Sequence, residues 1–158
     1  MQRIVPNLWF DDNGLEAAEY YTSVFPQSKI LQVTRYGEAG PLPAGTVLTI
    51  EFELRGERFT IINGGPQGFQ FSEAVSFLIN CADQDEVDYF WSEFEKEGEP
   101  GPCGWIKDKF GLSWQVCPIG FEEIMNDPDP ARRDRAMTAM FSMGKLDLAA
   151  LQRAADGA

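Results

Sequence analysis

The sequence predicts an α+β protein made of two successive βαβββ modules and a helical C-terminal tail. Two observations support the modules. A strand-like alternation, a helical pattern and a hairpin signal follow one another, and the same order then occurs a second time. The two expected helix starts, at Asp12 and Asp83, are about 71 residues apart, as a diverged internal repeat requires. Two such units that paired their sheets would leave a concave face between them.

The first module is expected to cover residues 1–66. Its predicted elements are strands at 4–10, 29–36, 47–54 and 58–62 and one helix at 15–25. The helix is predicted from apolar residues at helical spacing, and Pro26 stops it because proline cannot continue a helix. Gly56 lies between the last two strands and predicts a hairpin turn there.

The second, shorter module is expected to cover residues 67–118. Its predicted elements are a strand at 74–81, a helix at 82–98 and a hairpin over 103–118 that turns near Gly111. The helix has a capping signature, because Glu86 follows Asp83 at the spacing of a capping box. Its apolar face is formed by Val87, Phe90, Trp91 and Phe94.

Residues 119–158 are expected to form a helical extension. Pro128 and Pro130 open one predicted helix, and a second is expected over 147–155. We expect the two modules and the extension to form one compact unit.

Charge and composition restrict the function classes. The formal net charge is −12, and no lysine or arginine cluster is present, which argues against nucleic-acid and anionic-membrane partners. No apolar run is long enough to span a membrane. The chain has no histidine, so catalytic triads that depend on imidazole are excluded. Its three cysteines, Cys81, Cys103 and Cys117, form no CxxC pair, and we expect reduced thiols in a cytoplasmic protein.

Three strings in the sequence carry a family resemblance. INGGP at residues 62–66, NCADQDEVD at 80–88 and CGWIKDKFGLSWQ at 103–115 resemble the PhnB-like family, often described as demethylubiquinone-methyltransferase-like. That family belongs to the glyoxalase/bleomycin-resistance/dioxygenase (vicinal oxygen chelate) superfamily. The resemblance runs from about Ile4 to Leu151. It implies the glyoxalase/bleomycin-resistance fold, in which two βαβββ modules form a cupped mixed sheet, and a homodimer.

The resemblance does not extend to the chemistry of the family's descriptive name. No glycine-rich turn between a strand and a helix is present to hold S-adenosylmethionine, so we do not expect a methyltransferase. In metal-dependent members of the superfamily, the ligands are typically His, His and Glu. The matching positions here are Val5, Ser76 and Gln115, which supply no charge to a transition metal. We therefore expect no metal and no other cofactor.

Strand alternation, combined with the resemblance, predicts which side chains line the cup. These are neutral hydrogen-bonding residues and one aromatic residue: Asn7, Trp9, Asn63, Ser76, Asn80, Ser113 and Gln115. Such a set is typical of a small-molecule pocket. The alternative is that these groups only satisfy one another over a filled core.

Three functions remain open from the sequence. The first is a metal-free protein that binds a small molecule in a neutral cup. The second is a cofactor-independent isomerase or lyase that uses Glu51 or Glu53 as its base, although alternating glutamates are more often solvated edge residues. The third is a structural or regulatory dimer whose cup is vestigial.

Overall fold

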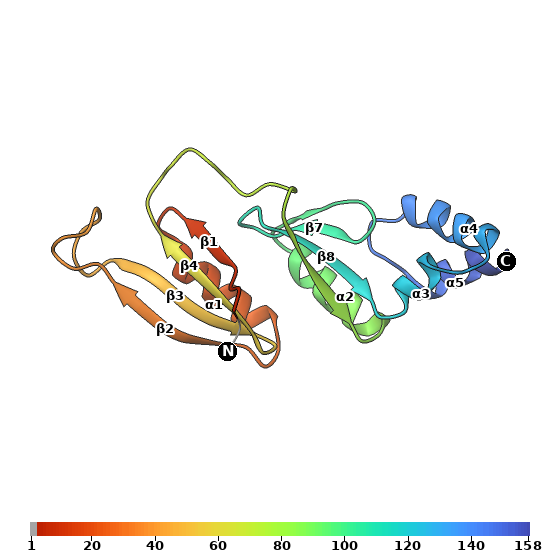
Figure 1. The fold of residues 1–158 in the computed structure, drawn as a ribbon, viewed down its shortest axis with the longest axis horizontal. Coiled ribbons are helices and arrows are strands. Elements are labelled where there is room, and N and C mark those ends of the chain that lie inside the picture. The colour runs from red at the N-terminus through yellow and green to blue at the C-terminus, as the bar shows by residue number, and fades with distance from the viewer. Residues whose placement is uncertain (1–2) are drawn as a thin grey trace. The chain divides into compact units, whose positions relative to one another are not determined.

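The computed structural model describes residues 3–158, which divide into two units. Unit 1 ends at Phe69, and unit 2 runs from Gln70 to Ala158. Each unit contains a βαβββ module with a four-stranded mixed sheet (Figure 1). In both sheets the module's first strand pairs with its fourth, then come the third and the second. The α+β fold class and the internal repeat predicted from the sequence are therefore confirmed.

The sheet of unit 1 is covered on one face by a single helix. The elements are β1 (Asn7–Phe10), α1 (Gly14–Val24), β2 (Lys29–Arg35), β3 (Val47–Leu54) and β4 (Glu57–Asn63). Helix α1 packs mainly on β3 and β4, where Tyr21 stacks on Phe52 with 6.1 Å between ring centroids. The β3–β4 turn has positive φ at both Arg55 (51°) and Gly56 (93°), as a two-residue hairpin turn of the primed type requires.

Unit 2 repeats this plan with shorter strands. Its module consists of β5 (Ser76–Cys81), α2 (Gln84–Glu95), β6 (Glu99–Pro100), β7 (Trp105–Lys107) and β8 (Ser113–Pro118). The capping prediction for α2 is confirmed, since the Asp83 carboxylate accepts from the Glu86 backbone N–H at 2.9 Å. The four predicted apolar residues of α2 are buried, and Phe94 stacks on Trp114 with centroids 5.3 Å apart.

The C-terminal extension has three helices, α3 (Phe121–Met125), α4 (Pro130–Phe141) and α5 (Leu148–Asp156). The last two agree with the sequence prediction, whereas the short α3 was not predicted. They form a small core of their own around Ile124, Ala136, Leu151 and Ala155. No helix in the described part of the chain is long and apolar enough to cross a membrane.

The extension is attached to the second module by backbone and side-chain hydrogen bonds. The N–H groups of Cys103 and Gly104 donate to the carbonyls of Met143 (2.8 Å) and Gly144 (2.7 Å). Gln84, at the start of α2, donates to the Leu146 carbonyl at 2.9 Å and accepts from the Leu148 N–H at 3.0 Å. These bonds fix the segment between α4 and α5 against the module, so the extension is part of unit 2.

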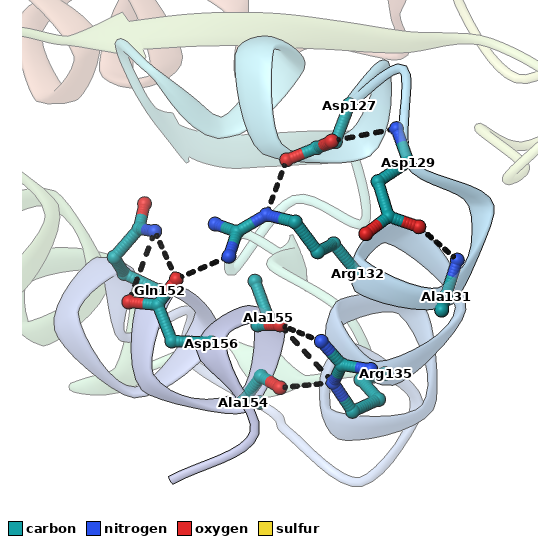
Figure 2. A network of polar contacts seen from close by, with 9 residues as sticks. All are labelled: Asp127, Asp129, Ala131, Arg132, Arg135, Gln152, Ala154, Ala155 and Asp156. Atoms are coloured by element: carbon teal, nitrogen blue, oxygen red, sulfur yellow. Dashed lines mark hydrogen bonds and ion pairs between the residues drawn. The ribbon is translucent and has the colours of Figure 1, made fainter.

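Arg132 ties the ends of the extension together (Figure 2). Its guanidinium donates to Asp127 at 2.9 Å and pairs with Asp156 at 2.6 Å. Both contacts hold the pKa values of these two carboxyl groups below their usual range. A second arginine, Arg135, donates to the carbonyls of Ala154 and Ala155 at the end of α5.

Replacing Phe52 by alanine is expected to lower the free energy of unfolding by about 3–5 kcal/mol, because the ring is fully buried against Tyr21 and Phe59. Urea unfolding followed by circular dichroism measures the change. Phe69→Ala is the control. Since Phe69 is 58% exposed, its loss should stay below about 1 kcal/mol. Equal effects of the two substitutions would contradict the packing described.

The Arg132 contacts also predict how the extension responds to acid. Carboxyl groups whose pKa is lowered by folding stabilise the protein above their ordinary value of 3.8, and this contribution disappears as the pH falls through the lowered values. Arg132→Met should therefore make the acid-induced loss of helical signal less steep. Far-UV circular dichroism between pH 6 and pH 2 measures it, with Lys29→Met as a control of the same charge change.

Candidate functional site

The sheet of unit 2 has one face covered by α2 and one face without a helix. Ile106, Trp114 and Val116 are buried on the α2 side. Because side chains alternate along a strand, their neighbours Lys107 and Ser113 point to the other side. The strand register places these two side chains on the same face, since Lys107 lies opposite Ser113 in the β7–β8 pair. We call this side the helix-free face of unit 2.

A hollow with a volume of about 420 Å³ opens at this part of unit 2. It is lined by Glu73, Glu99, Pro100, Gly101, Pro102, Trp105, Ile106, Lys107 and Ser113. The volume is within the range of small-molecule pockets, and the lining combines an apolar wall with a few polar groups. All its residues belong to unit 2.

Ser113 contributes the unusual polar atom of the hollow. Its residue is 1% exposed, and within residues 3–158 its hydroxyl oxygen has no hydrogen-bond partner. A buried polar group without a partner destabilises a protein by about 1–3 kcal/mol, and such groups are rare in native structures. Among the residues that line the hollow, Ser113 therefore contributes a buried hydroxyl that the described residues leave unpaired.

An ion pair and a further carboxylate surround the hollow. The Lys107 ammonium contacts the Glu73 carboxylate at 2.5 Å. The hydrogen bond from Lys107 holds the pKa of Glu73 below its usual range, and the same bond raises the pKa of Lys107. Glu99 on β6 lies opposite Lys107 in the β6–β7 register and contributes to that rise.

Asp108 fixes the turn that presents these residues. It is 3% exposed, and its carboxyl oxygens accept from the backbone N–H groups of Phe110 (2.8 Å) and Leu112 (3.1 Å) and from the indole N–H of Trp114 (2.9 Å). These bonds join the end of β7 to the start of β8. They set the β7–β8 register and thereby place Lys107 beside Ser113.

The positions that match superfamily metal ligands do not fit a transition metal. Ser76 and Gln115 are neighbours, with the Gln115 amide donating to the Ser76 hydroxyl at 2.9 Å. Both are neutral, and Val5 in unit 1 is apolar. In the part of the chain that the structure describes, no three His, Cys, Asp or Glu side chains are grouped closely enough to hold a metal ion. Ser76 and Gln115 instead form a hydrogen bond with each other.

The remaining predicted site residues lie in both units. Asn80 is exposed on β5, on the helix-free face of unit 2. In unit 1, Asn7 is exposed and Trp9 is half-buried, on the face of that sheet opposite α1. The Trp9 indole N–H donates to the Gly65 carbonyl at 3.0 Å. A ligand-binding role for these residues stays a prediction.

Asn63 lies on the helix-covered face of its sheet, although we expected it in the cup. It follows Phe59 and Ile61 at the spacing of two that places all three on the α1 side. Its side-chain oxygen accepts from the Gly14 N–H at 2.9 Å, and its amide donates to the carbonyls of Asp12 and Val47. These bonds commit the side chain to holding the start of α1.

The two glutamates proposed as bases lie on the helix-free face of unit 1. They alternate with Ile50 and Phe52, which are buried under α1. Glu51 is exposed and Glu53 is half-buried, in register with Thr60 and Arg58. A role as a base for either glutamate stays a prediction.

The charged and aromatic residues of the hollow are not among the site residues predicted from the sequence. Trp105 and Lys107 flank the apolar Ile106 on β7. They lie opposite Gln115 and Ser113 on β8, so strand alternation predicts them on the same face as these two residues. Glu99 belongs to a strand of two residues, which is too short to give a periodic pattern. Glu73 lies in the loop before β5, where no sequence rule assigns a direction.

Cys117 should be unreactive at neutral pH. Burial, with a smaller contribution from the Glu122 carboxylate, raises the pKa of its thiol to about 11. A short pulse of iodoacetamide at pH 8 should leave Cys117 unmodified by peptide mass spectrometry, whereas the urea-unfolded chain should be labelled. When the pH of the pulse is varied, a labelling midpoint for folded Cys117 near pH 9.0, the ordinary pKa of a thiol, would contradict this assignment.

Comparison with known proteins identifies the family. The family described as 3-demethylubiquinone-9 3-methyltransferase matches residues 2–117, so residues 118–158 lie outside the matched part. No curated protein matches the chain in sequence. The chain is similar to the solved structure of the PhnB protein from Bacillus cereus, with 33% sequence identity and a TM-score of 0.66 over 74% of this chain and 99% of that chain.

A protein from Pseudomonas aeruginosa, 18% identical, has the same fold, with a TM-score of 0.63 over 75% of this chain and 98% of its own. The family match covers both βαβββ modules, and the Bacillus cereus protein supports it at higher identity. The chain therefore belongs to the PhnB-like, 3-demethylubiquinone-9 3-methyltransferase-like family.

Proposed function

We propose that this protein binds a small molecule in the hollow of unit 2, without a metal ion. The observation that carries the proposal is the Ser113 hydroxyl, which is buried at the hollow and has no partner among the described residues. A ligand that hydrogen-bonds this oxygen would remove the cost of leaving it unpaired. This supplies a reason for a feature that a purely structural role does not explain.

The rest of the lining suits a ligand with a flat apolar part. The half-buried ring of Trp105 offers a stacking surface, and Pro100 and Pro102 add rigid apolar wall. The Lys107–Glu73 pair and Glu99 form the polar part. Apolar walls with few placed polar groups are the usual composition of a small-molecule site.

Methyl transfer from S-adenosylmethionine is not part of the proposal. The helix N-termini of both modules are used within the protein. The Asp83 side chain accepts the Glu86 N–H at the start of α2, and Asn63 accepts the Gly14 N–H at the start of α1. Neither turn carries the glycine-rich sequence that lets a nucleotide approach a helix start.

Base catalysis by Glu51 or Glu53 remains an alternative without an observation that favours it. A cytoplasmic location and a homodimer likewise stay predictions from the sequence.

Ser113→Ala should separate binding from stability. The substitution removes an unpaired buried hydroxyl, so the free energy of unfolding should stay unchanged or rise by about 1 kcal/mol. Affinity for 1-naphthalenemethanol, a flat compound with one hydroxyl, should fall about three- to tenfold, as the loss of one hydrogen bond predicts. NMR chemical-shift changes of the backbone amide and tryptophan indole N–H groups in 15N-labelled protein measure this affinity. They also show whether the Trp105 indole responds.

Ser92→Ala is the matched control, because the Ser92 hydroxyl bonds only the Tyr89 carbonyl on the exposed side of α2. It should change neither quantity appreciably. If Ser113→Ala instead destabilises the protein and leaves the affinity unchanged, the hydroxyl is satisfied inside the fold and the proposed site is wrong.

A further inference from the structure

We infer that the ligand of the unit 2 hollow carries a positive charge beside its flat apolar part, as a protonated arylalkylamine does. The inference rests on the proposed function and adds the chemical class of the ligand. It follows from three observations: the charge balance of the hollow, the hydrogen-bonding capacity of Ser113 and the half-buried ring of Trp105.

The ionisable side chains of the hollow leave one negative charge over. Three such side chains line it, namely Glu73, Glu99 and Lys107. The Lys107 ammonium is held by Glu73 at 2.5 Å, so these two charges largely cancel. The Glu99 carboxylate makes no hydrogen bond or close ion pair with any residue in the described range 3–158. A cation in the hollow would meet this remaining carboxylate.

Ser113 and Trp105 are compatible with an ammonium group. A serine hydroxyl has two acceptor lone pairs and can accept an N–H from the ligand, and Ser113 has no internal donor that competes for them. The face of a tryptophan ring attracts cations through its quadrupole. The Trp105 ring is half-buried in the lining, so part of its surface is open to the hollow. An acidic residue alone would not indicate a ligand, but the buried unpaired hydroxyl is independent of it.

An anionic ligand would meet two obstacles in the same hollow. The Lys107 ammonium is already paired with Glu73 at 2.5 Å, so it would attract a second anion less strongly. The charge of the ligand would also lie near Glu99, which is paired in register with Lys107 on the neighbouring strand. The net charge of −12 on the whole chain acts in the same direction, because it raises the local concentration of cations.

The test compares three naphthalene compounds that differ in charge: 1-naphthylmethylamine (cation), 1-naphthalenemethanol (neutral) and 1-naphthoate (anion). Affinities are measured at pH 7 from the NMR chemical-shift changes of backbone amide groups in the 15N-labelled 158-residue chain. The amine should bind at least about threefold more tightly than the alcohol, and the naphthoate should bind most weakly.

Glu99→Gln identifies the residue responsible for the preference. It should weaken amine binding about three- to fivefold and leave alcohol binding unchanged, so that the difference between the two compounds shrinks. Glu38→Gln is the matched control, since it removes the same charge from an exposed loop of unit 1. It should leave both affinities unchanged.

The possible outcomes separate this inference from the proposed function. The inferred positive charge of the ligand is wrong if the alcohol or the naphthoate binds as tightly as the amine. It is also wrong if Glu38→Gln lowers the affinity for the amine as much as Glu99→Gln does. The proposed binding function still stands in that case, provided that Ser113→Ala lowers the affinity for 1-naphthalenemethanol. If none of the three compounds shifts the amides of the hollow, both the inference and the proposed site are overturned.

Discussion

The hydrogen bonds of the buried Asp108 carboxyl group are the interaction on which the candidate site depends. Asp108 directly follows β7, and its carboxyl group accepts from two loop N–H groups and from the Trp114 indole on β8. Trp114 in turn stacks on Phe94 of α2, so one carboxyl group connects the turn, the sheet and its covering helix. A shift of one residue in this hairpin would move Lys107 and Ser113 to the α2 side, because strand side chains alternate.

This constraint explains how a short sheet can combine a packed side with a polar side. On β8, Trp114 and Val116 are buried under α2, and the alternate residues Ser113 and Gln115 are presented on the helix-free face. Gln115 finds a partner in Ser76 across the parallel β5–β8 pair, whereas Ser113 finds none among the described residues. The contrast between these two neighbouring side chains marks the position at which we propose that a ligand binds.

The sequence was sufficient for the elements with a strong periodic or capping pattern. Helix α2 was predicted with its cap and its buried face because Asp83, Glu86 and the four apolar residues follow local rules. The short elements could not be predicted in this way. The two residues of β6 form a strand only because β7 pairs with them, and α3 is stabilised by its contacts with α4 and α5.

The candidate site was partly predictable for the same physical reason. Ser76, Ser113 and Gln115 lie where alternation placed them, since each belongs to a strand with a clear apolar face. Asn63 lies on the α1 side because the strand continues to it, one residue past its predicted end at 62, and it follows Phe59 and Ile61 at a spacing of two. Glu73 reaches the hollow through an ion pair with Lys107 that links a loop to a strand, and no local pattern contains such information.

The most direct test of the account is a crystal structure of the protein purified without added ligand, interpreted at the Ser113 hydroxyl. The account predicts electron density for a bound molecule, or for ordered solvent that takes its place, within hydrogen-bonding distance of the Ser113 oxygen and beside the Trp105 ring. A Ser113 hydroxyl that donates to a protein carbonyl, in a hollow filled by packed side chains, would contradict it.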